Sequence, residues 1–128
     1  MVNNSKKILV VDDSNTNVVL LEAVFSSDGY TILTALSARE AFAIIKKEKP
    51  AIILLDLNMP GISGFDFLEQ IKAGDQSKNI PIVIVSAMTD DKSIKRAFAL
   101  GAVEFIKKPV DIRLLQERVF SLLQELNA

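Results

Sequence analysis

Short hydrophobic runs without polar alternation constrain this chain more than any other feature of its sequence. The runs 8–11 and 52–55 contain only Ile, Leu and Val, and the run 80–85 is equally apolar. A strand that is covered on both faces has this pattern, because it lies in a parallel sheet with helices on either side. The sequence therefore predicts an α/β layer protein.

Helical patterns alternate with these runs. Hydrophobic residues at helical spacing predict the buried faces of five helices: Val18, Leu21, Val24 and Phe25; Ala38, Ala41, Phe42 and Ile45; Phe65, Leu68 and Ile71; Ile94, Ala97 and Phe98; and positions 112, 115, 119, 122 and 126. Two more strands, 30–35 near the sheet edge and 103–106, complete the alternation. We expect one domain spanning 1–128, a flavodoxin-like (βα)5 three-layer sandwich whose parallel five-stranded sheet has the order 2-1-3-4-5.

Composition removes several classes of function. The net charge of -1 leaves no electrostatic footprint for direct nucleic-acid binding. The chain has no cysteine and no histidine, which excludes disulfides, thiolate metal sites and a histidine general base. The N-terminal residues lack the apolar core of a signal peptide, and no apolar run reaches the ~20 residues that span a bilayer. We expect a cytoplasmic protein with no membrane partner.

Reactive side chains follow four of the predicted strands. They are Asp12 and Asp13, Asp56, Ser86 and Lys108. The carboxyl ends of parallel strands share one edge of the sheet, where ligands bind, and the first and third strands are neighbours in the expected order. Three carboxylates would then meet. Like charges at close range raise one another's pKa and destabilise the fold unless a cation lies between them.

A divalent cation and a phosphoryl group together would account for all of these residues. Mg²⁺ suits a site made only of oxygen ligands. A phosphoryl group on Asp56 would also use Lys108 for charge and Ser86 for a hydrogen bond. Taken singly, Asp13 reads as a helix cap, Ser86 as a turn residue and Lys108 as a surface lysine. Four such groups at four strand ends favour a site instead.

The chain resembles the receiver domains of two-component response regulators over essentially its whole length. The residues that carry the resemblance are Val10-Val11-Asp12-Asp13, Leu54 to Gly61 around Asp56, Ser86-Ala87 and Lys108-Pro109, in the order and spacing of that family. The resemblance implies that Asp56 accepts a phosphoryl group from a phosphohistidine of a sensor histidine kinase or histidine phosphotransfer protein. It also implies that the domain catalyses only this transfer and a slow autodephosphorylation, and is otherwise no enzyme.

The same resemblance assigns the remaining site residues. It implies that Asp13, Asp56 and the backbone carbonyl of Asn58 ligate Mg²⁺, while Asp12 acts mainly through water. Lys108 would contact the phosphoryl oxygens, with a cis bond to Pro109. Asn58 and Met88 lie where the family varies its rate of dephosphorylation.

A switch is implied as well. In receiver domains the hydroxyl at the Ser86 position moves toward the phosphoryl group, and the aromatic ring at the Phe105 position turns into the space that is left. The change appears on the face made by the fourth helix, fifth strand and fifth helix, which would contact a downstream protein or form a homodimer. Phe105 is also consistent with an ordinary core residue.

The last helix is apolar on more than one side. Leu114, Phe120 and Leu123 fall off its main stripe, which indicates either a partner or dimer surface or a broad core face, and we favour the broad core face.

Three other functions compete with the receiver. A haloacid-dehalogenase-like phosphohydrolase needs a second acid two residues after its aspartate, where this chain has Asn58. A flavodoxin-like FMN carrier would bind the FMN phosphate at 14–17, where Asp12 and Asp13 would repel it and no glycine is present. A degenerate receiver that signals without phosphate would not need the full acidic set.

Overall fold

The structure is a computed structural model that describes residues 6–59 and 61–126. Its strands and helices alternate along the chain: β1 (Lys7–Val11), α1 (Asn15–Ser27), β2 (Thr31–Ala35), α2 (Ala38–Glu48), β3 (Ile52–Leu55), α3 (Gly64–Ala73), β4 (Ile82–Ser86), α4 (Asp91–Ala99), β5 (Glu104–Lys107) and α5 (Ile112–Leu126). The strands form one parallel sheet in the order β2-β1-β3-β4-β5. The predicted fold class and strand order are confirmed.

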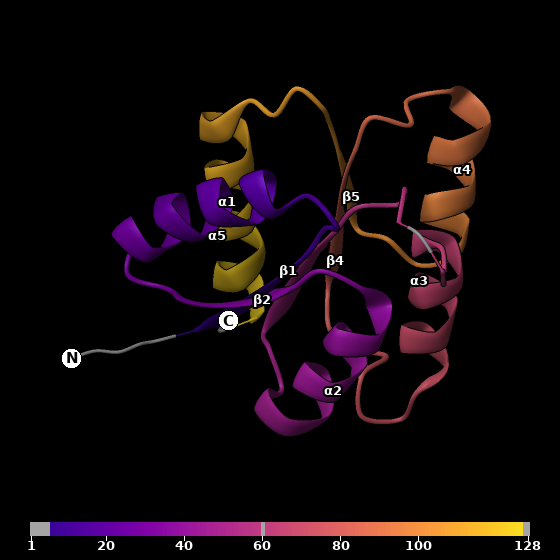
Figure 1. Ribbon diagram of the computed structural model, residues 1–128, viewed down its shortest axis with the longest axis horizontal. Coiled ribbons are helices and arrows are strands. Elements are labelled where there is room, and N and C mark those ends of the chain that lie inside the picture. Colours follow the sequence, from indigo (N-terminus) through magenta and orange to yellow (C-terminus); the bar gives the residue numbers. More distant parts are fainter. Residues whose placement is uncertain (1–5, 60, 127–128) are drawn as a thin grey trace.

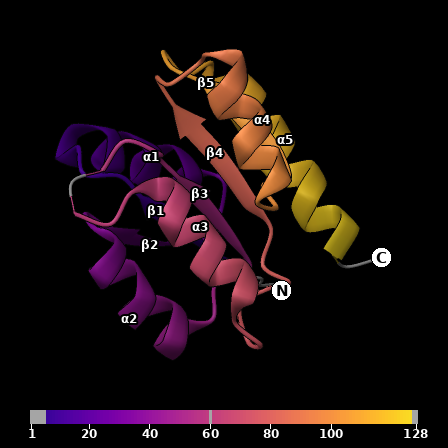
Figure 2. The same cartoon turned by 90° about the vertical axis from the view of Figure 1, so that its right-hand side faces the viewer.

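Helices cover both faces of the sheet. Figure 1 shows α1 and α5 on one side of the strands and α2, α3 and α4 on the other, and Figure 2 looks onto the second group. Alternate residues of each strand enter opposite cores: Ile8 and Val10 pack with α1 and α5, whereas Leu9 and Val11 pack with α2 and α3. This division explains the unbroken hydrophobic runs, because β1, β3 and β4 have no solvent face.

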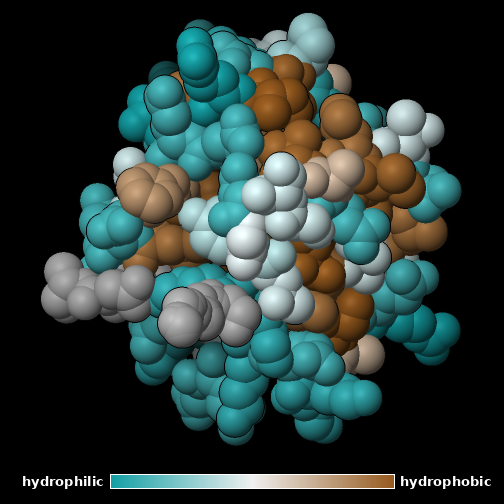
Figure 3. Space-filling view, turned by 90° about the vertical axis from the view of Figure 1, so that its left-hand side faces the viewer, coloured by the Kyte–Doolittle hydropathy of each residue, from teal (hydrophilic) through white to brown (hydrophobic). Residues whose placement is uncertain are grey.

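Helix α1 keeps hydrophobic surface toward solvent. Its buried residues are Val18, Leu21 and Phe25, but Val19 and Leu20 are 54% and 49% exposed. Figure 3 shows the side of the molecule on which α1 lies, with a band of hydrophobic surface among hydrophilic side chains. The core therefore uses only part of the apolar surface of this helix.

One predicted core residue of α4 is wrong. Phe98 is 44% exposed, and Ala97 is the buried residue of this helix, with Ile94 half-buried. Successive helical residues are rotated by about 100° from one another, so a helix that approaches the sheet through Ala97 turns the next side chain outward. The ring of Phe98 consequently adds to the surface of α4.

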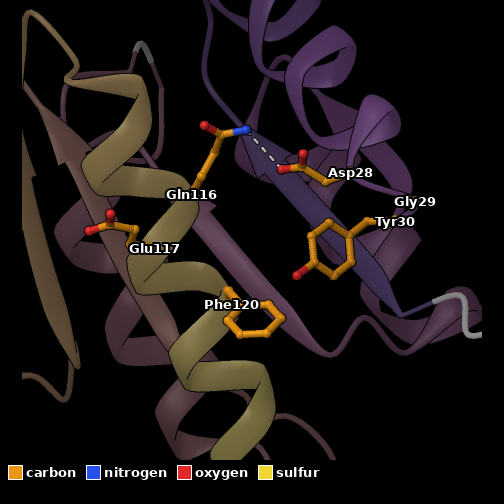
Figure 4. Close-up of a pocket in the computed structure, with 6 residues that line it drawn as sticks. All are labelled: Asp28, Gly29, Tyr30, Gln116, Glu117 and Phe120. Carbon is orange, nitrogen blue, oxygen red and sulfur yellow. Dashed lines mark hydrogen bonds between the residues drawn. The ribbon is translucent and has the colours of Figure 1, made fainter.

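The three residues off the main stripe of α5 divide between core and surface. Leu123 is buried, whereas Leu114 and Phe120 are 37% and 55% exposed, so a broad core face is the wrong interpretation for these two. Figure 4 shows the reason for Phe120: its ring lies opposite Tyr30 across a hollow between α5 and the turn after α1, to the side of the sheet.

We expect Leu123→Ala to lower the free energy of unfolding by about 2–5 kcal/mol, because it leaves a cavity between α5 and the sheet. Phe120→Ala should cost far less, since most of that ring already faces water. Urea denaturation of both variants measures the difference. Equal losses in the two variants would contradict the division of α5 described here.

Strand β4 begins and ends later than the sequence pattern indicates. It covers Ile82–Ser86 instead of 80–85, because Pro81 has no N–H to donate and Ser86 still pairs with Lys107 of β5. Within the described ranges, no helix is long and apolar enough to cross a membrane.

Candidate functional site

Two buried carboxylates lie side by side where β1 and β3 end. Val11 pairs with Leu55 in the sheet, and the N–H of Asp56 donates to the carbonyl of Val11 at 2.9 Å. The residue after each strand is therefore an aspartate at the same edge, and Asp12 and Asp56 are only 4% and 6% exposed. Burial of two neighbouring carboxylates is costly unless each finds donors or a cation.

The carboxylate of Asp12 is held by donors from three directions. Its Oδ1 accepts the N–H of Ser14 at 2.9 Å. Its Oδ2 accepts both the Lys108 ammonium at 2.9 Å and the side-chain amide of Asn17 at 3.3 Å. Ser14 also caps α1, since its Oγ accepts the N–H of Asn17 at 3.3 Å. The start of α1 is thus built around Asp12.

Within the described part of the chain, two donors reach the carboxylate of Asp56. Its Oδ1 accepts the N–H of Asn58 at 3.1 Å, and its Oδ2 accepts the Lys108 ammonium at 3.1 Å. The loop after β3 then contacts the start of α3, where the N–H of Gly64 donates to the Leu57 carbonyl at 3.0 Å. A Cβ at Gly64 would lie 2.6 Å from the carbonyl oxygen of Asp56, so only glycine allows this approach.

Lys108 joins the two buried carboxylates. It follows β5, its N–H donates to the Ser86 carbonyl at 2.9 Å, and its peptide bond to Pro109 is cis, the isomer that the resemblance implied. Its side chain is 19% exposed. Burial lowers the pKa of Lys108, but the hydrogen bonds and negative charges of Asp12 and Asp56 more than offset this effect and raise the pKa above its usual value. The ammonium is charged at neutral pH.

Asp13 completes an acidic cluster that could hold a metal ion. It is exposed, and one carboxylate oxygen each from Asp12, Asp13 and Asp56 lie within 4.8 Å of one another. Lys108 contacts only two of these three carboxylates, so among the described residues the cluster keeps an excess of negative charge. A hollow opens over this cluster and is also lined by Ser14, Asn58, Met59 and Ala87.

Ser86 ends β4 and Phe105 lies in β5, the two strands that follow β3 in the sheet order. Ser86 is fully buried, and its Oγ accepts the N–H of Met88 at 3.1 Å. Phe105 pairs with Ile84 on the adjacent strand and packs, half-buried, on the core beneath α2 to α4. Ser86 is two residues after Ile84, so its side chain shares the face of the sheet on which Phe105 packs. The two proposed switch residues are therefore diagonal neighbours.

Sequence reasoning missed two residues that shape this site. The sequence indicates Asn17 only as part of the polar segment 14–17 that an FMN carrier would use for its phosphate, although its place in the first turn after the acid pair could have suggested a contact with Asp12. Gly64 carries no signal in the sequence beyond following Ser63 at the start of a helix, because the close approach that requires glycine depends on how the loop after β3 packs against α3.

The hollow beside α5 is separate from the acidic cluster. It is lined by Asp28, Gly29 and Tyr30 from the turn after α1 and by Gln116, Glu117 and Phe120 of α5. In Figure 4 the Gln116 amide reaches across to Asp28, and their hydrogen bond measures 2.9 Å. This bond ties α5 to the turn after α1.

Comparisons with known proteins agree with this geometry. Residues 8–120 match the family model described as the response regulator receiver domain. The chain is 38% identical over 118 residues to the response regulator PleD of Caulobacter vibrioides, covering 92% of this chain but 26% of that protein. It is 35% identical over 115 residues to sporulation initiation phosphotransferase F of Bacillus subtilis, covering 90% of this chain and 91% of that protein. The chain thus spans about a quarter of the length of PleD.

Solved structures have the same fold. A two-component response regulator from Clostridium difficile superposes with a TM-score of 0.92 at 25% identity, covering 97% of this chain and all of that one. A response regulator receiver protein from Pseudomonas putida gives 0.87 at 31% identity, covering 94% of this chain and 99% of that one. Neither the phosphohydrolase nor the FMN carrier is favoured by these matches. The chain belongs to the response regulator receiver domain family and is a phosphorylatable signalling domain of two-component systems.

Proposed function

We propose that Asp56 is the phosphoryl acceptor of this receiver. The observation that carries the proposal is the position of its carboxylate, which lines the hollow near two other carboxylates and has Lys108 and the Asn58 N–H on separate oxygens. In the transfer, a carboxylate oxygen of Asp56 bonds to phosphorus while the bond from phosphorus to the donor atom breaks. The electron pair of that bond leaves with the donor.

We propose Mg²⁺ as the cation of this site. Two ligands on opposite sides of an Mg²⁺ ion are about 4.2 Å apart, and the three carboxylate oxygens within 4.8 Å of one another fit this spacing. Asp13, Asp56 and the carbonyl of Asn58 would be ligands, and Asp12 would act through water. When bound, the ion supplies positive charge for the phosphoryl oxygens. Lys108 supplies a second positive charge from the chain itself.

The switch would run through Ser86 and Phe105. Phosphorylation adds a charge of roughly -2 to the site. The Ser86 hydroxyl would exchange the Met88 N–H for a phosphoryl oxygen, and Phe105 would turn into the space beside it. The readout would appear on the surface made by α4, β5 and α5, which would bind a downstream protein or a second copy; α4 exposes Phe98 and α5 exposes Leu114. Asn58 and Met88 would set the rate of dephosphorylation.

The partners follow from the chemistry of the proposed acceptor. An aspartyl phosphate on this chain requires a donor with a high transfer potential, and the phosphohistidine of a sensor histidine kinase or a histidine phosphotransfer protein provides one. We further propose that 1–128 act as one receiver domain in the cytoplasm. The transfer to Asp56 and the slow hydrolysis of the aspartyl phosphate by water would be the only reactions that the domain catalyses.

Mass spectrometry after incubation with acetyl phosphate and Mg²⁺ tests the acceptor. We expect a gain of about 80 Da in the wild-type protein and no gain in Asp56→Asn. Asp66→Asn is the matched control, because Asp66 is an exposed carboxylate at the start of α3 and should leave labelling intact. An unlabelled wild-type protein, or labelling that persists in Asp56→Asn, would refute the assignment.

A further inference from the structure

We infer that Asn17 is a positioning residue for the cation site, whose side-chain amide holds Asp12 in place when Lys108 turns to the phosphoryl group. This inference rests on the proposed function. Asn17 lies in the first turn of α1 and donates to Oδ2 of Asp12 at 3.3 Å. A carboxylate only accepts hydrogen bonds, so the amide nitrogen must face it.

Phosphorylation would affect the two donors on Asp12 Oδ2, Lys108 and Asn17, differently. Lys108 is shared, because its ammonium lies 2.9 Å from Asp12 and 3.1 Å from Asp56. A phosphoryl group on Asp56 would draw this mobile cation toward its own oxygens. The neutral amide of Asn17 gains nothing comparable from such a move, so it stays on Asp12. Without it, a buried carboxylate oxygen would lose its protein donors, which is costly.

Asn17 is itself fixed by the residues around it. Its N–H donates to Oγ of Ser14, and the N–H of Ser14 donates to the other oxygen of Asp12. Asp12, Ser14 and Asn17 therefore form a closed set of hydrogen bonds at the start of α1. A short amide side chain anchored in this way cannot follow a moving charge, which is the property a positioning residue needs.

Helix stability gives no reason for an asparagine at this position. Ser14 is the N-cap of α1, so Asn17 is the third helical residue, where asparagine is a poorer helix former than alanine. The role of the Asn17 amide therefore lies in its hydrogen bond to Asp12. This difference also separates the two roles experimentally, because Asn17→Ala should not weaken the helix.

The test measures Mg²⁺ binding and the acetyl phosphate reaction in Asn17→Ala and in the isosteric Asn17→Leu. We expect the Mg²⁺ dissociation constant, from an NMR titration with beryllofluoride in place of the phosphoryl group, to rise about tenfold in both. The Mg²⁺ concentration for half-maximal labelling should rise likewise, while the labelling rate at saturating Mg²⁺ returns to that of wild type. The helix content from far-UV circular dichroism without Mg²⁺ should not fall in Asn17→Ala, because alanine is the better helix former.

Asn15→Ala is the control, because Asn15 is exposed in the same turn of α1. The loss should also be larger when Asn17→Ala is introduced into Lys108→Ala, where the amide is the remaining side-chain donor on Oδ2. If Asn17→Ala and Asn15→Ala bind Mg²⁺ as tightly as wild type, the inference is wrong although the wild type is still labelled. If the wild type is not labelled, the proposed function itself fails.

Discussion

Lys108→Ala will lower the free energy of unfolding by about 3 kcal/mol in magnesium-free buffer at neutral pH, and added Mg²⁺ will restore much of this loss. Lys108 is the ammonium that lies between Asp12 and Asp56, at 2.9 and 3.1 Å. Removing it leaves two buried carboxylates facing each other without a counter-charge, and removal of one partner from a buried ion pair costs about 3–5 kcal/mol. The hollow above the cluster is open to water, which places the expected loss at the lower end of that range.

Mg²⁺ should then stabilise Lys108→Ala more than it stabilises the wild type. The acidic cluster is more negative in this variant, so it attracts Mg²⁺ more strongly. The carboxylate oxygens that would bind Mg²⁺ are unchanged. Urea denaturation with and without Mg²⁺ measures both effects. Lys107→Ala, an exposed neighbour in β5, controls for loss of a positive charge at this end of the strand.

The switch should fail in the same variant. Beryllofluoride with Mg²⁺ stands in for the phosphoryl group and should shift the NMR resonances of Ser86 and Phe105 in the wild type. In Lys108→Ala these shifts should largely disappear, because the phosphoryl oxygens lose their cationic partner from the end of β5. A Lys108→Ala protein that is as stable as wild type without Mg²⁺, or that still switches, would contradict the role assigned to this lysine.

The fold and the convergence of the acids could be predicted because each depends on a simple periodic rule. Unbroken hydrophobic runs require strands covered on both faces, and Asp12 and Asp56 follow two runs that end at the same edge. Such rules do not predict the hydrogen bonds within the acidic cluster. The amide of Asn17 reaches Asp12 only because α1 starts immediately after the acid pair, at an angle that the sequence does not encode locally.

The errors have a physical cause in common. Phe98 and Phe120 are large hydrophobic residues on amphipathic helices, and helical spacing places them near the apolar face. Their exposure depends on which narrow strip of the helix touches the sheet, and this follows from packing of the whole layer. In α4 that strip is centred on Ala97. The size of a side chain is therefore a poor guide at the borders of a helix face.

Gly64→Ala will destabilise the domain by about 3 kcal/mol and slow the labelling of Asp56. An added Cβ would lie 2.4 Å from Cα of Leu57 and 2.6 Å from the carbonyl oxygen of Asp56, both of them main-chain atoms. Main chain cannot rotate away as a side-chain tip can, so the start of α3 must move from the loop after β3. Overpacking of this kind costs about 1–3 kcal/mol and sometimes more, and here it also breaks the bond from the Gly64 N–H to Leu57.

Gly61, in the same loop between β3 and α3, provides the matched control. Gly61 has a φ of 78°, and a Cβ there would meet nothing within 4 Å, so Gly61→Ala should cost only the about 1–2 kcal/mol of placing alanine in a left-handed conformation. Its labelling rate should stay close to wild type, because the main chain of Asp56 is not pushed. Urea denaturation and the time course of acetyl phosphate labelling compare the two variants. If Gly64→Ala proves no less stable than Gly61→Ala, the contact between α3 and the Asp56 loop is not the constraint that holds the acceptor in place.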